Sequence, residues 1–163
     1  MRRISSYVVL ILLSFFAATG CERDTHPDRL NKPAPLFNIS DGRESIDLSQ
    51  YRGHPVVLNL WASWCVPCVE ELPSLEAMQK MMPGIKVIAI STDQDDDVYR
   101  KFLIEHNVDF PTVRDPNGRI NTLYGTVKIP ETYIIDRQGI LRRKFISAQD
   151  WTSPQIMTYL LKL

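Results

Sequence analysis

The sequence has no excess of either charge and few histidines and cysteines, and both shortages argue against classes of function. Its 163 residues carry 19 basic and 19 acidic side chains, which gives a formal net charge of zero at pH 7. Proteins that bind nucleic acids usually carry a basic stripe, so the charge gives no reason to expect such a partner. The histidines are scattered along the chain, at His26, His54 and His106. No second pair of ligands at short spacing accompanies the cysteines, so a zinc site is not expected either.

The sequence also lacks an apolar run long enough to cross a membrane. The run over 7–18 is well short of the roughly 20 residues that span a bilayer, which argues against a transmembrane anchor. Two arginines precede this run and Ala18-Thr19-Gly20-Cys21 ends it, a layout typical of an export signal. Small residues directly before a cysteine resemble the lipobox of bacterial lipoproteins, although those signals more often carry Leu at the position of Ala18. We therefore expect cleavage after Gly20 and a lipid on Cys21.

The composition predicts one compact domain behind this export signal. Hydrophobic residues make up 44% of the chain, and the sequence contains no internal repeat or low-complexity segment. Residues 22–35 are polar and rich in proline, which is typical of an extended linker rather than a packed element. We expect a lipoprotein signal peptide at 1–20, a tether at 21–35 and a single domain at 36–163.

The hydrophobic pattern of this domain alternates between strand and helix. The run 56–60 is continuous, aliphatic and bounded by turn residues, as expected for a strand covered on both faces. Residues 65–82 place apolar side chains three and four apart, which predicts a helix with one apolar face. The alternation continues to the C-terminus and indicates an α/β sandwich with a mixed sheet. The further strands are expected at 85–90, 112–114, 132–136 and 140–146, with a helix over 95–107.

The most informative stretch is Trp61-Ala62-Ser63-Trp64-Cys65-Val66-Pro67-Cys68, directly after the strand expected at 56–60. Two cysteines at helix positions i and i+3 are neighbours, so this pair can open and close as a disulfide. If the helix begins near Cys65, the free N–H groups and the positive dipole end of its first turn favour a thiolate there. Pro67 suits such a start because proline costs no hydrogen bond in the first turn. Cys65 is therefore the expected nucleophile and Cys68 the resolving thiol.

The cysteine pair has two other interpretations. The first is a structural disulfide, but a bond across so short a loop would constrain the unfolded chain very little and would therefore stabilise the fold very little. Two thiols alone could bind Cu(I), because soft thiolates select that ion. A Cu(I)-binding, chaperone-like module in oxidase assembly is therefore the alternative function, and no other metal or cofactor is expected.

The W-C-x-P-C motif after a strand, followed much later by Ile129-Pro130-Glu131-Thr132 before another strand, resembles the thioredoxin superfamily. More narrowly, residues 34–163 resemble the membrane-anchored protein disulfide reductases of the TlpA, ResA and CcmG type. The resemblance implies a thioredoxin-like three-layer sandwich with a mixed central sheet and a helix-strand insertion at about 95–114. It also implies that Pro130 is cis and that the loop of Ile129 and Pro130 docks an extended substrate segment.

Asn59 departs from the thioredoxin pattern, because plain thioredoxins place at this position a buried Asp that moves protons for the inner cysteine. In the TlpA-like group a Glu one turn after the second cysteine takes over, and Glu71 stands there. The resemblance thus implies that Glu71 exchanges a proton with Cys68, with water alone as the alternative, whereas Glu70 is expected to face solvent. Trp64 is expected to shield the site and contact the substrate.

These observations predict a lipid-anchored thiol-disulfide oxidoreductase at the periplasmic face of a bacterial membrane, reducing specific protein disulfides. The resemblance implies apocytochrome c or similar thiol proteins as substrates. It also implies a membrane electron donor of the DsbD or CcdA kind. C-x-x-C proteins have reduction potentials between about −270 and −120 mV, and Val66-Pro67 does not calibrate that scale.

Overall fold

The computed structural model of the protein describes residues 29–163. The predicted signal peptide, Cys21 and about half of the expected tether therefore lie outside the described residues. Within 29–163, no helix is both long and apolar enough to cross a membrane.

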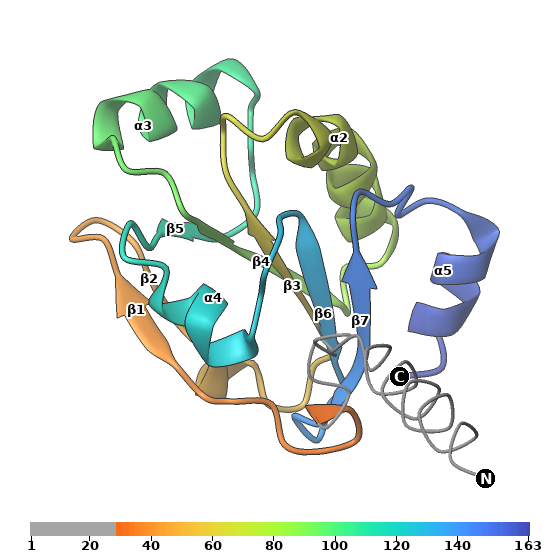
Figure 1. Ribbon diagram of the computed structural model, residues 1–163. Helices are drawn as coiled ribbons and strands as arrows, with labels where there is room; N and C mark the ends of the chain where they lie inside the picture. The colour runs from red at the N-terminus through yellow and green to blue at the C-terminus, as the bar shows by residue number, and fades with distance from the viewer. Residues whose placement is uncertain (1–28) are drawn as a thin grey trace, which may run out of the picture.

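A mixed sheet of five strands forms the centre of the molecule, in the order β5-β4-β3-β6-β7 (Figure 1). β3 and β4 are parallel, as are β4 and β5, whereas β6 runs antiparallel to both β3 and β7. All six residues of β3 are buried, as expected for the continuous aliphatic run at 56–60. The strands are β3 Val56–Trp61, β4 Lys86–Ser91, β5 Thr112–Arg114, β6 Glu131–Ile135 and β7 Leu141–Ile146.

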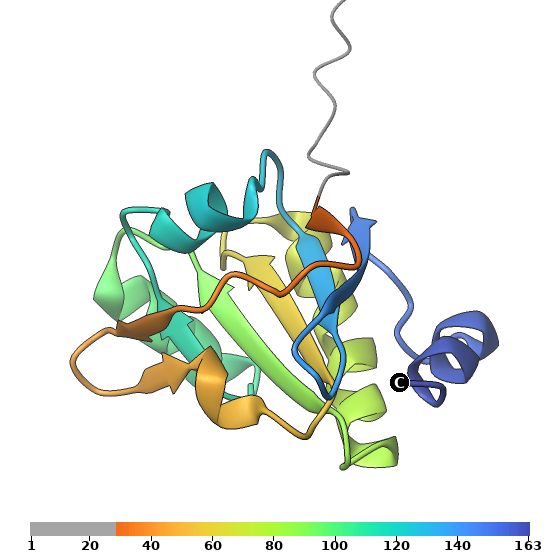
Figure 2. The ribbon, with the colours of Figure 1, turned by 90° about the horizontal axis from the view of Figure 1, so that it is seen from below.

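Helices cover both faces of the sheet and complete three layers. Side chains of α2, α3 and α5 share one apolar cluster with Val57 and Trp61 of β3. Side chains of α4 pack on the opposite face with Leu58 and Leu60, because successive residues of a strand point to opposite sides. Figure 2 shows α2 and α4 on opposite sides of the sheet. The helices are α2 Val66–Met81, α3 Asp96–Glu105, α4 Arg119–Tyr124 and α5 Pro154–Leu160.

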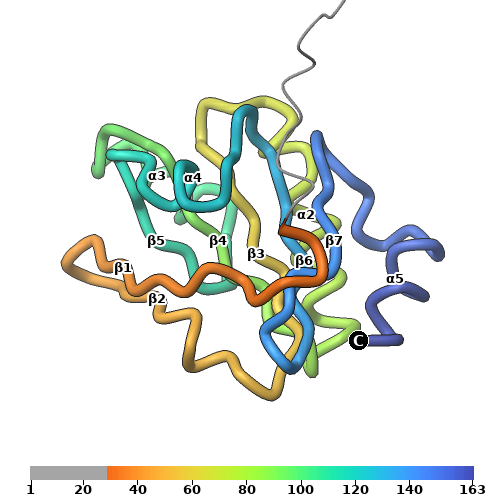
Figure 3. Tube along the Cα trace, turned by 60° about the horizontal axis from the view of Figure 1, so that its bottom comes forward, coloured from red at the N-terminus to blue at the C-terminus, as the bar shows by residue number. Residues whose placement is uncertain are grey.

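The predicted helix-strand insertion is confirmed as α3 followed by β5. An N-terminal hairpin of β1 Asn38–Ser40 and β2 Ser45–Asp47 lies beside β5 (Figure 3). The buried carboxylate of Asp41, in the turn of this hairpin, pairs with Arg100 of α3 at 3.3 Å. The hairpin and the insertion are therefore joined directly to each other.

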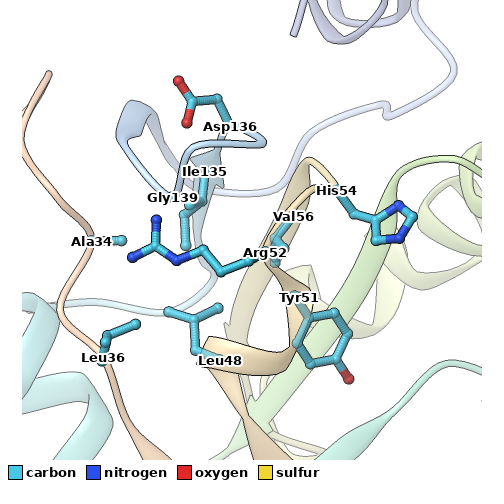
Figure 4. A pocket seen from close by; sticks show the side chains of 10 residues that line it. All are labelled: Ala34, Leu36, Leu48, Tyr51, Arg52, His54, Val56, Ile135, Asp136 and Gly139. Carbon is cyan, nitrogen blue, oxygen red and sulfur yellow. The ribbon is translucent and has the colours of Figure 1, made fainter.

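A small cavity lies at the end of the sheet where β3 begins (Figure 4). Its volume is about 10 Å³, enough for no more than about one water molecule. The guanidinium of Arg52 lies across Gly139 and donates to the carbonyl of Gln138. Gly139 has a φ of 75°, and a Cβ at this position would overlap Arg52, so only glycine suits it. This cavity is too small for more than a water molecule, and the candidate functional site lies at the opposite end of β3.

Candidate redox site

The two cysteines form a disulfide at the start of α2, where the chain leaves the carboxyl end of β3. Cys65 is the N-cap of the helix, and Pro67 lies in its first turn. The bond joins Cys65 and Cys68 with their Cα atoms 5.2 Å apart, so the i, i+3 spacing brings the sulfurs together as expected. Cys65 Sγ also accepts a hydrogen bond from the main-chain N–H of Cys68 at 3.3 Å.

The two sulfurs are in different surroundings. Cys68 is fully buried, whereas Cys65 keeps 6% of its surface exposed at the helix N-terminus. Once the disulfide is opened, the N–H of Cys68 and the positive end of the helix dipole favour negative charge on Cys65. The geometry therefore supports attack by Cys65 and leaves Cys68 as the inner partner.

Glu71 lies one helical turn after Cys68 and is 2% exposed. Its Oε1 accepts from Asn59 Nδ2 at 2.8 Å, and its Oε2 accepts from the Gln149 main-chain N–H at 3.0 Å and from Trp151 Nε1 at 3.3 Å. Burial raises the pKa of Glu71, and these three hydrogen bonds, which favour the charged form, offset that rise only in part. The Glu71 carboxyl therefore loses its proton at a higher pH than an ordinary glutamate does.

The amide of Asn59 links this acid to the strand that follows the proline loop. Asn59 Nδ2 donates to Thr132 Oγ1 at 2.9 Å as well as to Glu71. Asn59 lies on β3 and Thr132 on β6, where they face each other in the antiparallel register. Glu70, by contrast, is exposed, as expected.

The peptide bond between Ile129 and Pro130 is cis, which confirms the prediction from the family resemblance. Glu131 pairs with Leu60 in the sheet register, so this proline loop lies at the same end of the sheet as the disulfide. Ile129 packs against the apolar clusters on both faces of the sheet. The structure therefore brings Ile129 and Pro130 to the end of the molecule that holds Cys65 and Cys68.

The two tryptophans of the motif differ in their exposure to solvent. Trp61 is fully buried, whereas 67% of Trp64 is exposed beside Cys65. A groove of about 350 Å³ extends from this side chain along α3, and its lining residues are Ser63, Trp64, Val98, Lys101, Phe102 and Glu105.

Sequence reasoning missed the buried Asp93, which fixes the segment before Cys65. Its carboxylate accepts from the main-chain N–H of Ser63 at 2.9 Å, from Ser63 Oγ at 2.6 Å and from Ser91 Oγ. An acid two residues after the buried strand β4 was the available signal, because the carboxyl ends of the parallel strands β3 and β4 meet at one edge. Gln149 and Trp151 were also missed, and main-chain donors such as the N–H of Gln149 leave no mark in a sequence.

The residues present offer little for a metal. Within the described part of the chain, no three His, Cys, Asp or Glu side chains lie close enough together to hold an ion. A site could be made only by the two thiols after reduction of the disulfide.

Comparisons with known proteins agree with this geometry. The model of the AhpC/TSA family matches residues 30–144. The thiol-disulfide oxidoreductase ResA of Bacillus cereus is 28% identical over 99% of this chain and 96% of its own length. The thiol:disulfide interchange protein DsbE of Pseudomonas fluorescens is 30% identical over 87% of this chain and 82% of its own length.

A solved structure is similar as well. A Chlorobium tepidum protein described as a thiol:disulfide interchange protein DsbE superimposes with a TM-score of 0.72 and is 29% identical, covering 82% of this chain and 93% of its own. The predicted thioredoxin-like fold is confirmed by this likeness. With a cysteine disulfide at the start of α2 and this similarity over nearly its whole length, the chain belongs to the AhpC/TSA family, as a thioredoxin-like thiol-disulfide oxidoreductase of the ResA and DsbE type.

Proposed function

We propose that this protein reduces disulfides of specific extracytoplasmic proteins, with Cys65 as the attacking thiolate, Cys68 as the resolving thiol and Glu71 as the proton carrier. The observation that supports this most is the contrast between the cysteines. Cys65 caps a helix with a main-chain donor on its sulfur, whereas Cys68 is buried behind it.

The reaction has two steps. The Cys65 thiolate attacks one sulfur of the substrate disulfide, which forms a mixed disulfide and releases the other substrate sulfur as a thiolate. Cys68 then loses its proton and attacks Cys65 Sγ, which releases the first substrate sulfur and closes the Cys65–Cys68 disulfide. The substrate gains two electrons and two protons, and the protein is returned to its dithiol form by a second thiol protein.

Glu71 would take the proton of Cys68 in the second step. A general base works best when its pKa lies near the working pH, and burial moves the pKa of this carboxyl upward. Helix geometry supports the role, since residues three apart on α2 are neighbours. Asn59 cannot titrate, so it would orient the carboxyl rather than replace it.

Substrate contacts are proposed for Trp64, Ile129 and Pro130. Trp64 presents a large exposed ring next to Cys65, and rings of this kind contribute strongly to protein interfaces. The loop of Ile129 and Pro130 lies at the same end of the sheet and would pair through its backbone with an extended substrate segment.

The proposed placement of the protein is supported by the pattern of its N-terminal sequence. A lipoprotein signal at 1–20, a lipid on Cys21 and a tether over 21–35 would hold the domain at 36–163 at the periplasmic face of the membrane. Apocytochrome c or similar thiol proteins are the proposed substrates, and a membrane protein of the DsbD or CcdA kind is the proposed electron donor.

The test is the reduction potential of the Cys65–Cys68 pair. A value toward the thioredoxin end of the range, about −270 mV, would support a reductase, and a value near −120 mV would contradict the proposed direction of electron flow. Metal titration of the dithiol form distinguishes a disulfide reductase from the alternative function, a Cu(I)-binding module. Stable stoichiometric Cu(I) binding without disulfide exchange would favour a copper chaperone instead.

A further inference from the structure

A short loop after β7 joins the buried acid to the proline loop. This loop, residues 147–151 (the 147–151 loop), begins at Ser147, whose φ of 69° is left-handed. The main-chain N–H of Ser147 donates to the carbonyl of Pro130 at 3.0 Å. Two residues later, the main-chain N–H of Gln149 donates to Glu71 Oε2 at 3.0 Å. The loop therefore contacts the two elements that the proposed reaction uses.

The side chain of Gln149 holds the shape of this loop. Its Nε2 donates to the carbonyls of Ser147 at 2.8 Å and Ala148 at 2.9 Å, and lies 3.5 Å from the carbonyl of Ile146. Two donor hydrogens thus satisfy the two nearer carbonyls of a turn that forms no helix or strand. These bonds fold the backbone back on itself just before Trp151.

The end of the loop is anchored on α2. The main-chain N–H of Trp151 donates to Ser74 Oγ at 3.2 Å, and Trp151 Nε1 donates to Glu71 Oε2 at 3.3 Å. The Trp151 side chain is fully buried, so its indole cannot turn away. Both donors to Glu71 Oε2 therefore come from the 147–151 loop, and their direction depends on the conformation of this loop.

We propose that Gln149 is a positioning residue for Glu71, because its side-chain amide folds the 147–151 loop so that two N–H groups reach Glu71 Oε2. This inference rests on the proposed function only where it concerns the rate of disulfide exchange. The donors favour the charged carboxylate, and hydrogen bonds to charged groups are stronger than those between neutral ones. Loosening the loop therefore shifts the protonation of Glu71 further toward the neutral acid.

Few other titratable groups face this carboxyl. Cys68 lies one turn earlier on α2, Glu70 precedes Glu71 and is exposed, and Asp150 follows Gln149 in the 147–151 loop and is exposed. From β3 and β6, the facing side chains are the neutral Asn59 and Thr132. A substitution at Gln149 would thus change the protonation of Glu71 mainly through the two hydrogen-bond donors of the 147–151 loop.

The experiment compares Gln149→Met with Gln138→Met in the full domain. Methionine keeps the length of the side chain and removes the amide, and Gln138 is an exposed glutamine in the turn between β6 and β7. The pKa of Glu71 is measured from its carboxyl ¹³C shift, and the amide proton shift of residue 149 is followed over the same pH range. We expect an upward pKa shift and a flattened amide titration in Gln149→Met, and neither change in Gln138→Met. Gln149→Ala gives the same test if the methionine variant does not fold.

The outcomes separate this inference from the proposed function. An unchanged pKa of Glu71 in folded Gln149→Met or Gln149→Ala would overturn the positioning role. If the pKa shifts and the pH profile of disulfide exchange shifts with it, both ideas are supported. If the pKa shifts while the exchange profile stays in place, Gln149 positions Glu71, but the proton-carrier role of Glu71 is wrong.

Discussion

Asn59 Nδ2 donates a hydrogen bond to Glu71 Oε1 at 2.8 Å, and both side chains are buried between β3 and α2. The second hydrogen of the same amide goes to Thr132 Oγ1. An amide with both donors in use has a fixed orientation and cannot take up a proton. Glu71 is therefore the titratable member of a network that runs from the strand before the disulfide to the strand after the proline loop.

Replacing Glu71 by Gln should slow the resolution of mixed disulfides, because the side chain keeps its size but loses proton exchange. General acid–base groups contribute 100-fold or more, so we expect a loss of roughly 100-fold in that step. Stopped-flow measurement of tryptophan fluorescence, which reports on Trp64 beside the disulfide, follows the reaction.

Glu70→Gln is the matched control, because it makes the same chemical change on the exposed face of the same helix. Its rate and pH profile should equal those of the wild type. Equal rates and profiles in all three proteins would mean that Glu71 is only a buried structural acid.

Asn59→Asp should make folding stability depend more steeply on pH. Two carboxyls about one hydrogen bond apart cannot both ionise easily, so the variant raises the pKa of the pair above that of Glu71 alone. When folding raises the pKa of a carboxyl, the protonated carboxyl contributes its full stabilisation of the folded state at pH values below the unfolded pKa, which is 4.5 for glutamate. This contribution is lost as the pH rises through the pKa of the folded state. The contribution of Glu71 should therefore fall with rising pH in the wild type, and the contribution of the pair should fall further in Asn59→Asp.

Urea unfolding of the oxidised proteins from acidic to mildly alkaline pH measures this effect. Each pKa unit of upward shift costs about 1.4 kcal/mol once the group is ionised. Parallel curves for the two proteins would show that the carboxyl at position 59 does not couple to Glu71.

The sequence predicted those parts of the fold that depend on local pattern. The strand at 56–60, the helix after Cys65 and the cysteine pair follow from hydrophobic period and spacing, and the structure has all three within a residue or so. The cis bond before Pro130 has no local cause in the sequence, and only the family resemblance predicted it.

The surroundings of the site depend on contacts between distant parts of the chain. The N–H of Gln149 reaches Glu71 across 78 positions, and the carboxylate of Asp93 reaches Ser63 across 30. A main-chain donor has no side chain that a pattern could identify. The sequence thus predicted the bonded cysteine pair, whereas the main-chain and side-chain groups around it could not be predicted.

Replacing Cys68 by Ala should trap substrate proteins on Cys65. Attack by Cys65 still forms the mixed disulfide, but no second thiol remains to resolve it. Non-reducing electrophoresis of cells that express the variant would reveal these adducts. Cys65→Ala is the control, and adducts of equal amount in that variant would show that Cys65 is not the nucleophile.

Replacing Cys21 by Ser should remove the proposed lipid anchor. The variant is expected to appear as a soluble or an uncleaved form, because the serine cannot carry the lipid that holds the processed protein. Fractionation of cells after metabolic labelling with palmitate measures both the lipid and the location. A processed Cys21→Ser protein that stays in the membrane would refute the lipoprotein interpretation.

Asp93→Asn tests whether the segment before Cys65 must be held in place for protein substrates. The carboxylate accepts from Ser63 N–H, Ser63 Oγ and Ser91 Oγ, and an amide offers only one oxygen to these donors. A buried donor left without a partner costs about 1–3 kcal/mol, so the free energy of unfolding should fall by that amount. Trp64, which follows Ser63, should lose its fixed position, so KM for a protein disulfide should rise while the rate with a small disulfide changes little. Asp97→Asn, an exposed acid in the first turn of α3, makes the same charge change and should alter neither quantity. If Asp93→Asn lowers both rates equally, Asp93 supports the fold as a whole rather than the surface that Trp64 presents.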